Sequence, residues 1–163
     1  MGLSFFASVC YNDCKQKERE MTVQMEIALA TGRQFPAIRS FDRHIPSPRL
    51  ADCINNNQVY VLRADQEIRG VLRYSLFWQT IPFLDLIYLD EACRSQGWGK
   101  RMMKHWESVM GAMGYTYTML STQADETAKF FYEKLGYRRV GAFLPPKQDA
   151  EEILYLKQIQ TKE

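Results

Sequence analysis

The residues with the clearest chemical potential lie in one short segment, residues 94–100 (RSQGWGK), between an expected strand and an expected helix. Its two glycines let the main chain approach a ligand closely, and the first turn of a helix offers unpaired amide donors and a partial positive charge. Lys100 and Arg101 add formal charge beside that turn. The segment predicts an anion-binding turn, although glycines that only make a tight strand-to-helix turn explain it about equally well.

Two common phosphate-binding loops are excluded by their spacing. A Walker A loop has four residues between its glycines, whereas Gly97 and Gly99 are one residue apart. It also needs Ser or Thr after its lysine, where this chain has Arg101. A dinucleotide-binding turn requires Gly or Ala at the position of Met102.

A second segment follows about 30 residues later, at residues 128–137 (AKFFYEKLGY). Together with the spacing Arg94-x-x-Gly97-x-Gly99, it resembles the two cofactor motifs of the GNAT superfamily of N-acetyltransferases. The first motif is similar to the pyrophosphate loop for acetyl-CoA, and the second to a helix that ends in Phe-Tyr-x-x-x-Gly-Tyr before a strand. The resemblance covers roughly residues 24–160, and two motifs in register are more specific than a pair of glycines.

The resemblance implies that acetyl-CoA is the cofactor and the acetyl donor. The strand at residues 83–89 would part from its parallel neighbour at residues 115–121, and the pantetheine arm would enter the gap. Main-chain groups of Ile87 and Leu89 would hold that arm as an added strand is held, while amides of residues 96–100 would hold the pyrophosphate. The implied cofactor-binding residues are Ile87, Leu89, Arg94, Ser95, Gln96, Gly97, Trp98, Gly99, Lys100 and Asp125.

Asp125 departs from the family pattern, which often has Asn three residues before the motif alanine. One hydrogen bond to the cofactor therefore depends on whether the Asp side chain replaces that of Asn. The alternative is that Asp125 caps the N-terminus of the helix that follows.

Two catalytic residues are expected, Tyr132 and Asp85. The resemblance implies that the Tyr132 hydroxyl protonates the departing thiolate of CoA. A free alkylamine has a pKa of about 10, so a base must take its proton, and a lone Asp85 inside FLDLIYL is hard to explain by packing. Strand alternation would place Asp85 on the same side as Ile87 and Leu89, at the strand gap. A structural hydrogen bond explains Asp85 about equally well, and water is the base in many members of the family.

The acceptor is expected to contact the irregular segment at residues 40–46 (SFDRHIP). Asp42 and His44 lie two residues apart there, and Asp42 could pair with an ammonium group. Trp78, at the end of an expected strand, would form a wall of the same pocket. A solvated loop remains the simpler explanation for Asp42 and His44, and core packing for Trp78.

Periodicity predicts the elements that must position these residues. Helices are expected at residues 99–113 and 125–135, and in short pieces between residues 32 and 57. Strands are expected at residues 24–31, 59–64, 68–78, 83–89, 115–121, 140–143 and 153–159, with Pro82 breaking the chain before the fourth. This order predicts an α/β (mixed α+β) GNAT fold, with a central twisted, mostly antiparallel mixed sheet, helices on both faces and one parallel crossover through the helix at residues 99–113.

The composition is typical of one globular domain, with 163 residues of which 46% are hydrophobic and 25% charged. We interpret residues 1–20 as an N-terminal appendage, for which disorder is one option, and residues 21–163 as a single acetyltransferase domain. The net charge of +2 comes from scattered residues, so no nucleic-acid partner is expected.

The spacing of the cysteines at positions 10, 14, 53 and 93 does not match a metal site, so we expect no metal and a reduced, cytoplasmic protein. No apolar run approaches the roughly 20 residues of a membrane span, and the N-terminus is a poor signal peptide, so no membrane association is expected. The expected partners are acetyl-CoA and an amine-bearing acceptor, with a homodimer left open.

Two functions are compatible with these features. The leading one is an N-acetyltransferase that moves acetyl from acetyl-CoA to a primary amine of a small molecule or peptide, by direct attack in a ternary complex. The alternative is a non-catalytic acyl-CoA-binding or sensing module on the same fold. The presence of Tyr132 favours the enzyme.

Overall fold

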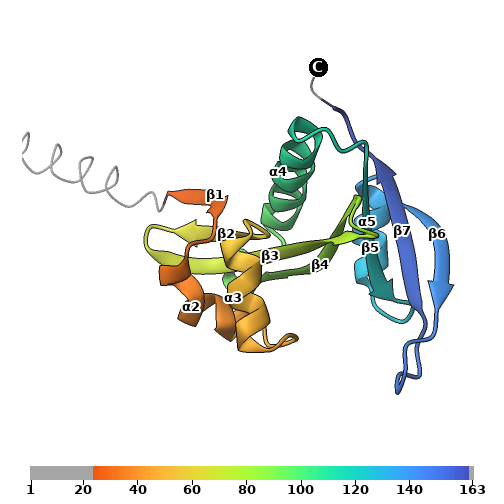
Figure 1. Cartoon of the computed structure of the whole chain (residues 1–163), viewed down its shortest axis with the longest axis horizontal. Coiled ribbons are helices and arrows are strands. Elements are labelled where there is room, and N and C mark those ends of the chain that lie inside the picture. Colours follow the sequence, from red (N-terminus) through yellow and green to blue (C-terminus); the bar gives the residue numbers. More distant parts are fainter. Residues whose placement is uncertain (1–23, 162–163) are drawn as a thin grey trace, which may run out of the picture.

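The computed structural model describes residues 24–161 (Figure 1). Its strands are β1 (Met25–Leu29), β2 (Val59–Ala64), β3 (Glu67–Phe77), β4 (Ile81–Leu89), β5 (Tyr117–Gln123), β6 (Arg138–Phe143) and β7 (Glu152–Gln158). Its helices are α2 (Phe35–Phe41), α3 (Ser47–Asn55), α4 (Trp98–Ala112) and α5 (Ala128–Lys134), with single 3-10 turns at η1 (Gly32–Gln34) and η2 (Glu91–Cys93).

The strands form one seven-stranded sheet in the order β1-β2-β3-β4-β5-β7-β6. Every neighbouring pair is antiparallel except β4 and β5, which are parallel and are joined in sequence through α4. The parallel pairing is short, because only Phe83 with Met119 and Leu84 with Leu120 are in register. Beyond Leu84, the side of β4 that faces β5 has no strand partner. The predicted mixed, mostly antiparallel sheet is confirmed.

Helices cover both faces of this sheet, as the sequence predicts. Figure 1 shows α4 on one side of strands β2 to β4 and α2 with α3 on the other. Strand β2 needs cover on both faces, because successive residues point to opposite faces and nearly all of them are buried. Tyr60 and Leu62 join the cluster under α4, whereas Val59 and Val61 join the cluster under α2 and α3.

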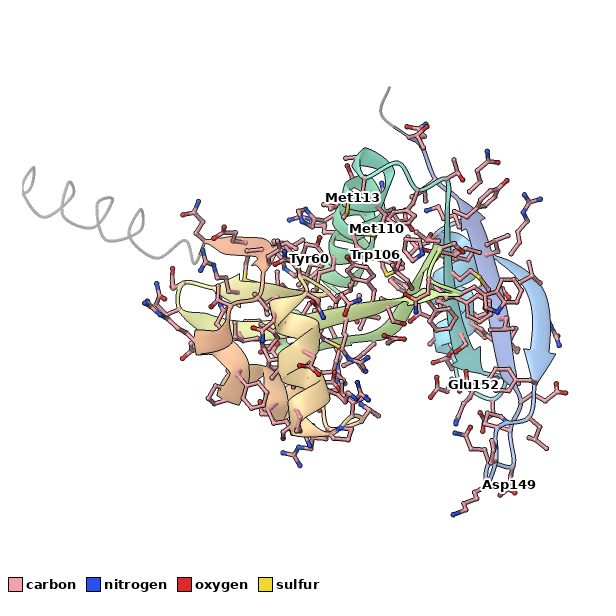
Figure 2. All side chains as sticks on the ribbon, in the orientation of Figure 1. Tyr60, Trp106, Met110, Met113, Asp149 and Glu152 are labelled. Atoms are coloured by element: carbon pink, nitrogen blue, oxygen red, sulfur yellow. The ribbon has the colours of Figure 1, made fainter. Side chains whose placement is uncertain are left out.

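The amphipathic pattern of α4 sets how that helix packs. Met102, Trp106 and Met110 recur at four-residue spacing and are all buried, and Figure 2 shows Trp106 and Met110 on the helix with Tyr60 of β2 nearby. Met113, the last methionine of the expected stripe, is exposed instead. It lies just beyond the last helical residue, Ala112, and so leaves the buried stripe.

Pro82 does not break the chain before β4, and that prediction was wrong. The strand begins at Ile81 and pairs with β3 from there onward. Because β4 pairs with β5 only from Phe83, Pro82 stands near the strand start with one free side, where a missing N–H costs little.

Several expectations fall on residues outside the described range. The N-terminal appendage, Cys10 and Cys14 belong to residues 1–23, and residues 162–163 are likewise not described. Within residues 24–161, Cys53 and Cys93 are free thiols and no group of side chains is placed to hold a metal ion. No helix in that same range is long and apolar enough to cross a membrane.

Candidate active site

A cleft of about 580 Å³ opens where β4 leaves its neighbour β5 and the chain turns into α4. It is lined by main-chain and side-chain atoms of the end of β4, the following turn, the start of α4, and α5. The lining residues are Ile87, Tyr88, Leu89, Arg94, Ser95, Gly97, Gly99, Lys100 and Phe131. The fold thus brings most of the expected cofactor-binding residues to one cleft.

The start of α4 has the features expected of an anion-binding turn. Gly97 is the N-cap residue and has a φ of +83°, a left-handed conformation that favours glycine. No side chain caps this end, and the first helical bond runs from the Arg101 amide to the Gly97 carbonyl at 3.1 Å. The amides of Trp98, Gly99 and Lys100 therefore have no helical acceptor.

Arg94 lines the cleft, and two contacts hold its side chain against the end of β4. Its Nε donates to the Leu89 carbonyl at 3.0 Å, and its guanidinium carbon lies 5.1 Å from the centre of the Tyr88 ring. The Leu89 carbonyl therefore already has one donor, while its second lone pair stays available.

Three predicted cofactor-binding residues do not line the cleft. The Gln96 side chain turns back to donate to the Ala92 carbonyl, and Trp98 packs partly against the core with the Arg101 guanidinium 4.4 Å from its ring centre. Asp125 lines a separate hollow together with Asp149 of the β6–β7 loop, which Figure 2 labels.

Asp125 is also not the cap of α5. That helix begins at Ala128 with Thr127 as its N-cap residue, so the capping alternative was wrong. Asp125 lies two residues before the cap, in the loop between β5 and α5.

Tyr132 is buried on α5 behind Phe131, with their ring centres 5.3 Å apart. Burial, with the Glu126 carboxylate as a second cause, raises the pKa of Tyr132 to about 12. Glu126 is itself held by the Thr122 hydroxyl, which donates to it at 2.7 Å. The Tyr132 hydroxyl has no hydrogen-bond partner among residues 24–161 and keeps its proton at neutral pH.

Asp85 is displaced from the strand alternation by a β-bulge. Tyr74 pairs with Leu84 and Arg73 pairs with Leu86, so Asp85 is the extra residue of the bulge and has no residue opposite it in the β3–β4 register. The prediction that Asp85 shares a side with Ile87 and Leu89 was therefore wrong: those two pack against the α4 cluster, whereas Asp85 faces the side of α2 and α3.

On that side Asp85 has two partners. Nη1 of Arg73 donates to Asp85 Oδ2 at 2.9 Å, and the Ser75 hydroxyl donates to Oδ1 at 2.9 Å. The side chain is only 22% exposed while the main chain of the residue is open. Burial raises the pKa of Asp85, Arg73 and Ser75 act to lower it, and Asp42 adds a smaller upward effect.

Asp42 is fully buried just beyond α2 and is not open to a ligand. Its Oδ2 accepts from Nε of Arg73 at 2.6 Å, and its Oδ1 accepts from the His44 amide at 3.2 Å. The expectation that Asp42 pairs with an acceptor ammonium is corrected, since its carboxylate already serves the guanidinium. The His44 side chain is 69% exposed, and Trp78 lies in the β3–β4 turn and does not line the cleft.

The sequence reasoning missed Arg73, which joins Asp42 to Asp85, and did not assign Phe131 or Tyr88 to the cleft. A signal for Arg73 was present, because a lone arginine inside the apolar run GVLRYSL is as unusual as a lone Asp85 inside its own strand. Phe131 lay in the second motif but was not given a contact.

Comparison with known proteins agrees with this geometry. A family model described as an acetyltransferase (GNAT) domain matches residues 55–139, just over half of the chain. No curated protein matches the sequence significantly.

Several solved structures share the fold at low identity. Ard1 from Thermoplasma volcanium has a TM-score of 0.73 at 16% identity, over 83% of this chain and 97% of its own. The ribosomal-protein-S18-alanine N-acetyltransferase from Escherichia coli has a TM-score of 0.71 at 15% identity, over 86% and 97%. PaiA N-acetyltransferase from Thermoplasma acidophilum, solved in complex with coenzyme A, has a TM-score of 0.69 at 15% identity, over 83% and 99%. The family match, supported by this shared fold, shows that the chain belongs to the GNAT family of acetyltransferases.

Proposed function

We propose that the protein is an acetyl-CoA-dependent N-acetyltransferase that moves an acetyl group to a primary amine of a small molecule or peptide, by direct attack in a ternary complex. The observation that carries this proposal is the continuity of the cleft. It runs from the unpaired stretch of β4 to the amides at the start of α4. An extended arm rich in amides, with an anionic end, matches that shape and polarity.

The described residues fit acetyl-CoA. The main chain of β4 after Leu84 can bond the amides of the pantetheine arm, because no strand occupies that side. A Cβ added at Gly97 would meet no atom within 4 Å, so the turn leaves open space in which a diphosphate can approach the amides of α4. Lys100 and Arg94 would offset its charge. When bound, the cofactor supplies an acetyl thioester open to attack by an amine.

Asp85 is the proposed route for the proton of the amine. Burial raises its pKa, so it is a stronger base than an ordinary aspartate, but still far weaker than an alkylamine of pKa about 10. The Asp85 carboxylate would therefore hold the ammonium group of the acceptor while a proton of that ammonium passes to water, and the carboxylate would not stay protonated. Partial exposure of the side chain gives that water access.

Tyr132 is the proposed partner of the departing sulfur. With a pKa of about 12 the hydroxyl is fully protonated in the resting protein, so it can donate a hydrogen bond. An ordinary thiol has a pKa of about 8.5, so complete proton transfer from this hydroxyl would be uphill. We therefore assign Tyr132 a hydrogen bond to the developing thiolate of CoA, which requires no complete proton transfer.

The test is to incubate the protein with acetyl-CoA and a panel of primary amines, following free thiol and the mass of the acetylated product. Release of CoA with matching N-acetyl product supports the proposal. Calorimetric binding of acetyl-CoA without CoA release for any amine would instead support the acyl-CoA-binding module.

A further inference from the structure

Three aromatic side chains form a row along the β3–β4 hairpin. The Phe77 ring centre lies 4.7 Å from that of Trp78 and 6.0 Å from that of Phe83. Trp78 is 79% exposed, and the other two rings are partly exposed. We call Phe83, Phe77 and Trp78 the aromatic row.

The aromatic row starts beside Asp85. Phe83 pairs across the hairpin with Ser75, so both side chains point to the same face of the sheet. The Ser75 hydroxyl donates to Asp85, which places the carboxylate on that face too. The β-bulge is what turns Asp85 toward the aromatic row and away from the cofactor-binding cleft.

Asp42 and Asp85 share one guanidinium. Arg73 is the only guanidinium that the described residues place on these two carboxylates, Asp42 and Asp85. Arg39 lies close by but donates to the main-chain carbonyls of Asp42 and Ile45. His44 Nδ1 lies 3.5 Å from Asp42 Oδ1, on the Asp42 carboxylate rather than on Asp85. Asp42 is fully buried, so Asp85 is the carboxylate of this pair that a ligand can reach.

We propose that the acceptor is a primary amine with a single positive charge on an apolar, preferably aromatic, body. This inference rests on the proposed acetyltransferase function. The ammonium would pair with Asp85 and the body would lie along the aromatic row, where burial of apolar area favours binding. A polyamine fits less well, because the described site exposes one carboxylate and places the Arg73 cation directly behind it.

Two sources can supply this chemistry: a free arylalkylamine, or a peptide whose first residue is aromatic. The experiment measures kcat/KM with acetyl-CoA for 2-phenylethylamine, ethylamine, spermidine and a short peptide beginning with Phe. We expect 2-phenylethylamine or the peptide to exceed ethylamine and spermidine by at least about tenfold, mainly through a lower KM. Whichever of the two is better identifies the source.

Variants of the row test its role directly. In Trp78→Ala and Phe83→Leu, the ratio of kcat/KM between 2-phenylethylamine and ethylamine should fall toward one. Phe130→Ala is the matched control, since Phe130 is a 54% exposed aromatic on α5 and should leave the ratio unchanged.

The outcomes separate this inference from the function on which it rests. Equal or better turnover of spermidine or ethylamine, or a preference that survives in the Trp78→Ala, Phe83→Leu double variant, overturns the inference and leaves the acetyltransferase intact. Binding of acetyl-CoA with no turnover of these four amines also counts against it. If the protein neither binds acetyl-CoA nor releases CoA, the result contradicts both the acceptor inference and the proposed acetyltransferase function.

Discussion

At the scale of single residues, Tyr132 offers the cleanest test because only its hydroxyl has a proposed role. Tyr132→Phe keeps the ring that packs against Phe131 and removes the donor. A hydrogen-bond donor to a developing charge is worth about 10² to 10³ in rate, and water can replace part of it, so we expect kcat to fall at least about tenfold. Calorimetry should give a nearly unchanged Kd for acetyl-CoA.

Tyr60→Phe is the control for this experiment. Burial also raises the pKa of Tyr60 to about 12. Tyr60 lies on β2, whereas the Tyr132 ring contacts Phe131, which lines the cleft. Its variant should keep wild-type kcat. Wild-type kcat in Tyr132→Phe, measured where chemistry limits turnover, would leave Tyr132 as a packing residue.

The proposed role of Asp85 predicts how the rate of acetyl transfer depends on pH. Asp85→Asn keeps the shape and removes the base, so we expect the rate at pH 7 to fall at least about tenfold, with a smaller defect near pH 9 where more of the amine is free. The wild-type protein loses this advantage as pH falls through the raised pKa of Asp85, because the carboxylate then becomes protonated. Rate profiles from pH 5 to 9 measure this.

Ser75→Ala gives a matched comparison with the carboxylate intact. The Ser75 hydroxyl lowers the pKa of Asp85, so its removal should raise that pKa and move the acid limb of the profile to higher pH. Identical profiles in the wild type and both variants would assign Asp85 a structural role.

At the scale of elements, the start of α4 depends on the conformation and the empty space at Gly97. Gly97→Glu would place a carboxylate where the anion should lie, so the affinity for acetyl-CoA should collapse by at least about a hundredfold. Gly97→Gln is the control for size, since it carries the same left-handed strain of about 1 kcal/mol without the charge. The Gly97→Gln variant should bind acetyl-CoA more tightly than Gly97→Glu. An unchanged Kd for acetyl-CoA in a folded Gly97→Glu protein would contradict the assignment of the α4 start as the diphosphate site.

At the scale of the whole molecule, one buried polar network joins α4 to the far half of the sheet. Glu107 of α4 accepts from the Tyr137 hydroxyl at 2.9 Å and from Lys157 Nζ of β7 at 2.6 Å. Thr118 of β5 completes it, 3.0 Å from the same hydroxyl. The network ties the helix that starts the cleft to strands on the other side of the gap.

Removal of Glu107 should therefore destabilise the fold. Glu107→Ala leaves a hydroxyl and an ammonium without their shared acceptor, and we expect the free energy of unfolding to fall by about 2 kcal/mol. Glu107→Gln keeps one acceptor oxygen and should lose less. Urea denaturation of both variants checks this, and equal midpoints for Glu107→Ala and the wild type would contradict it.

Much of the fold follows from local patterns. The apolar, β-branched run VYVLRA predicts residues 59–64 as a strand, and the structure has the same bounds. The four-residue spacing of Met102, Trp106 and Met110 predicts α4, because a helix of period 3.6 puts such residues on one face. The glycine turn before α4 is also local, since left-handed backbone at Gly97 needs no distant contact.

The acceptor side was decided by tertiary structure. The bulge that turns Asp85 away from Ile87 depends on the register between β3 and β4, which alternation within one strand does not encode. Asp42 and Arg73 are 31 residues apart and meet only when α2 packs on the sheet. The sequence by itself determined the order of the helices and strands and the glycine turn before α4, because their signals lie within a few residues. Only the folded chain decided which carboxylate is buried and which stays open, because cross-strand pairing and helix packing set the surroundings of each charge.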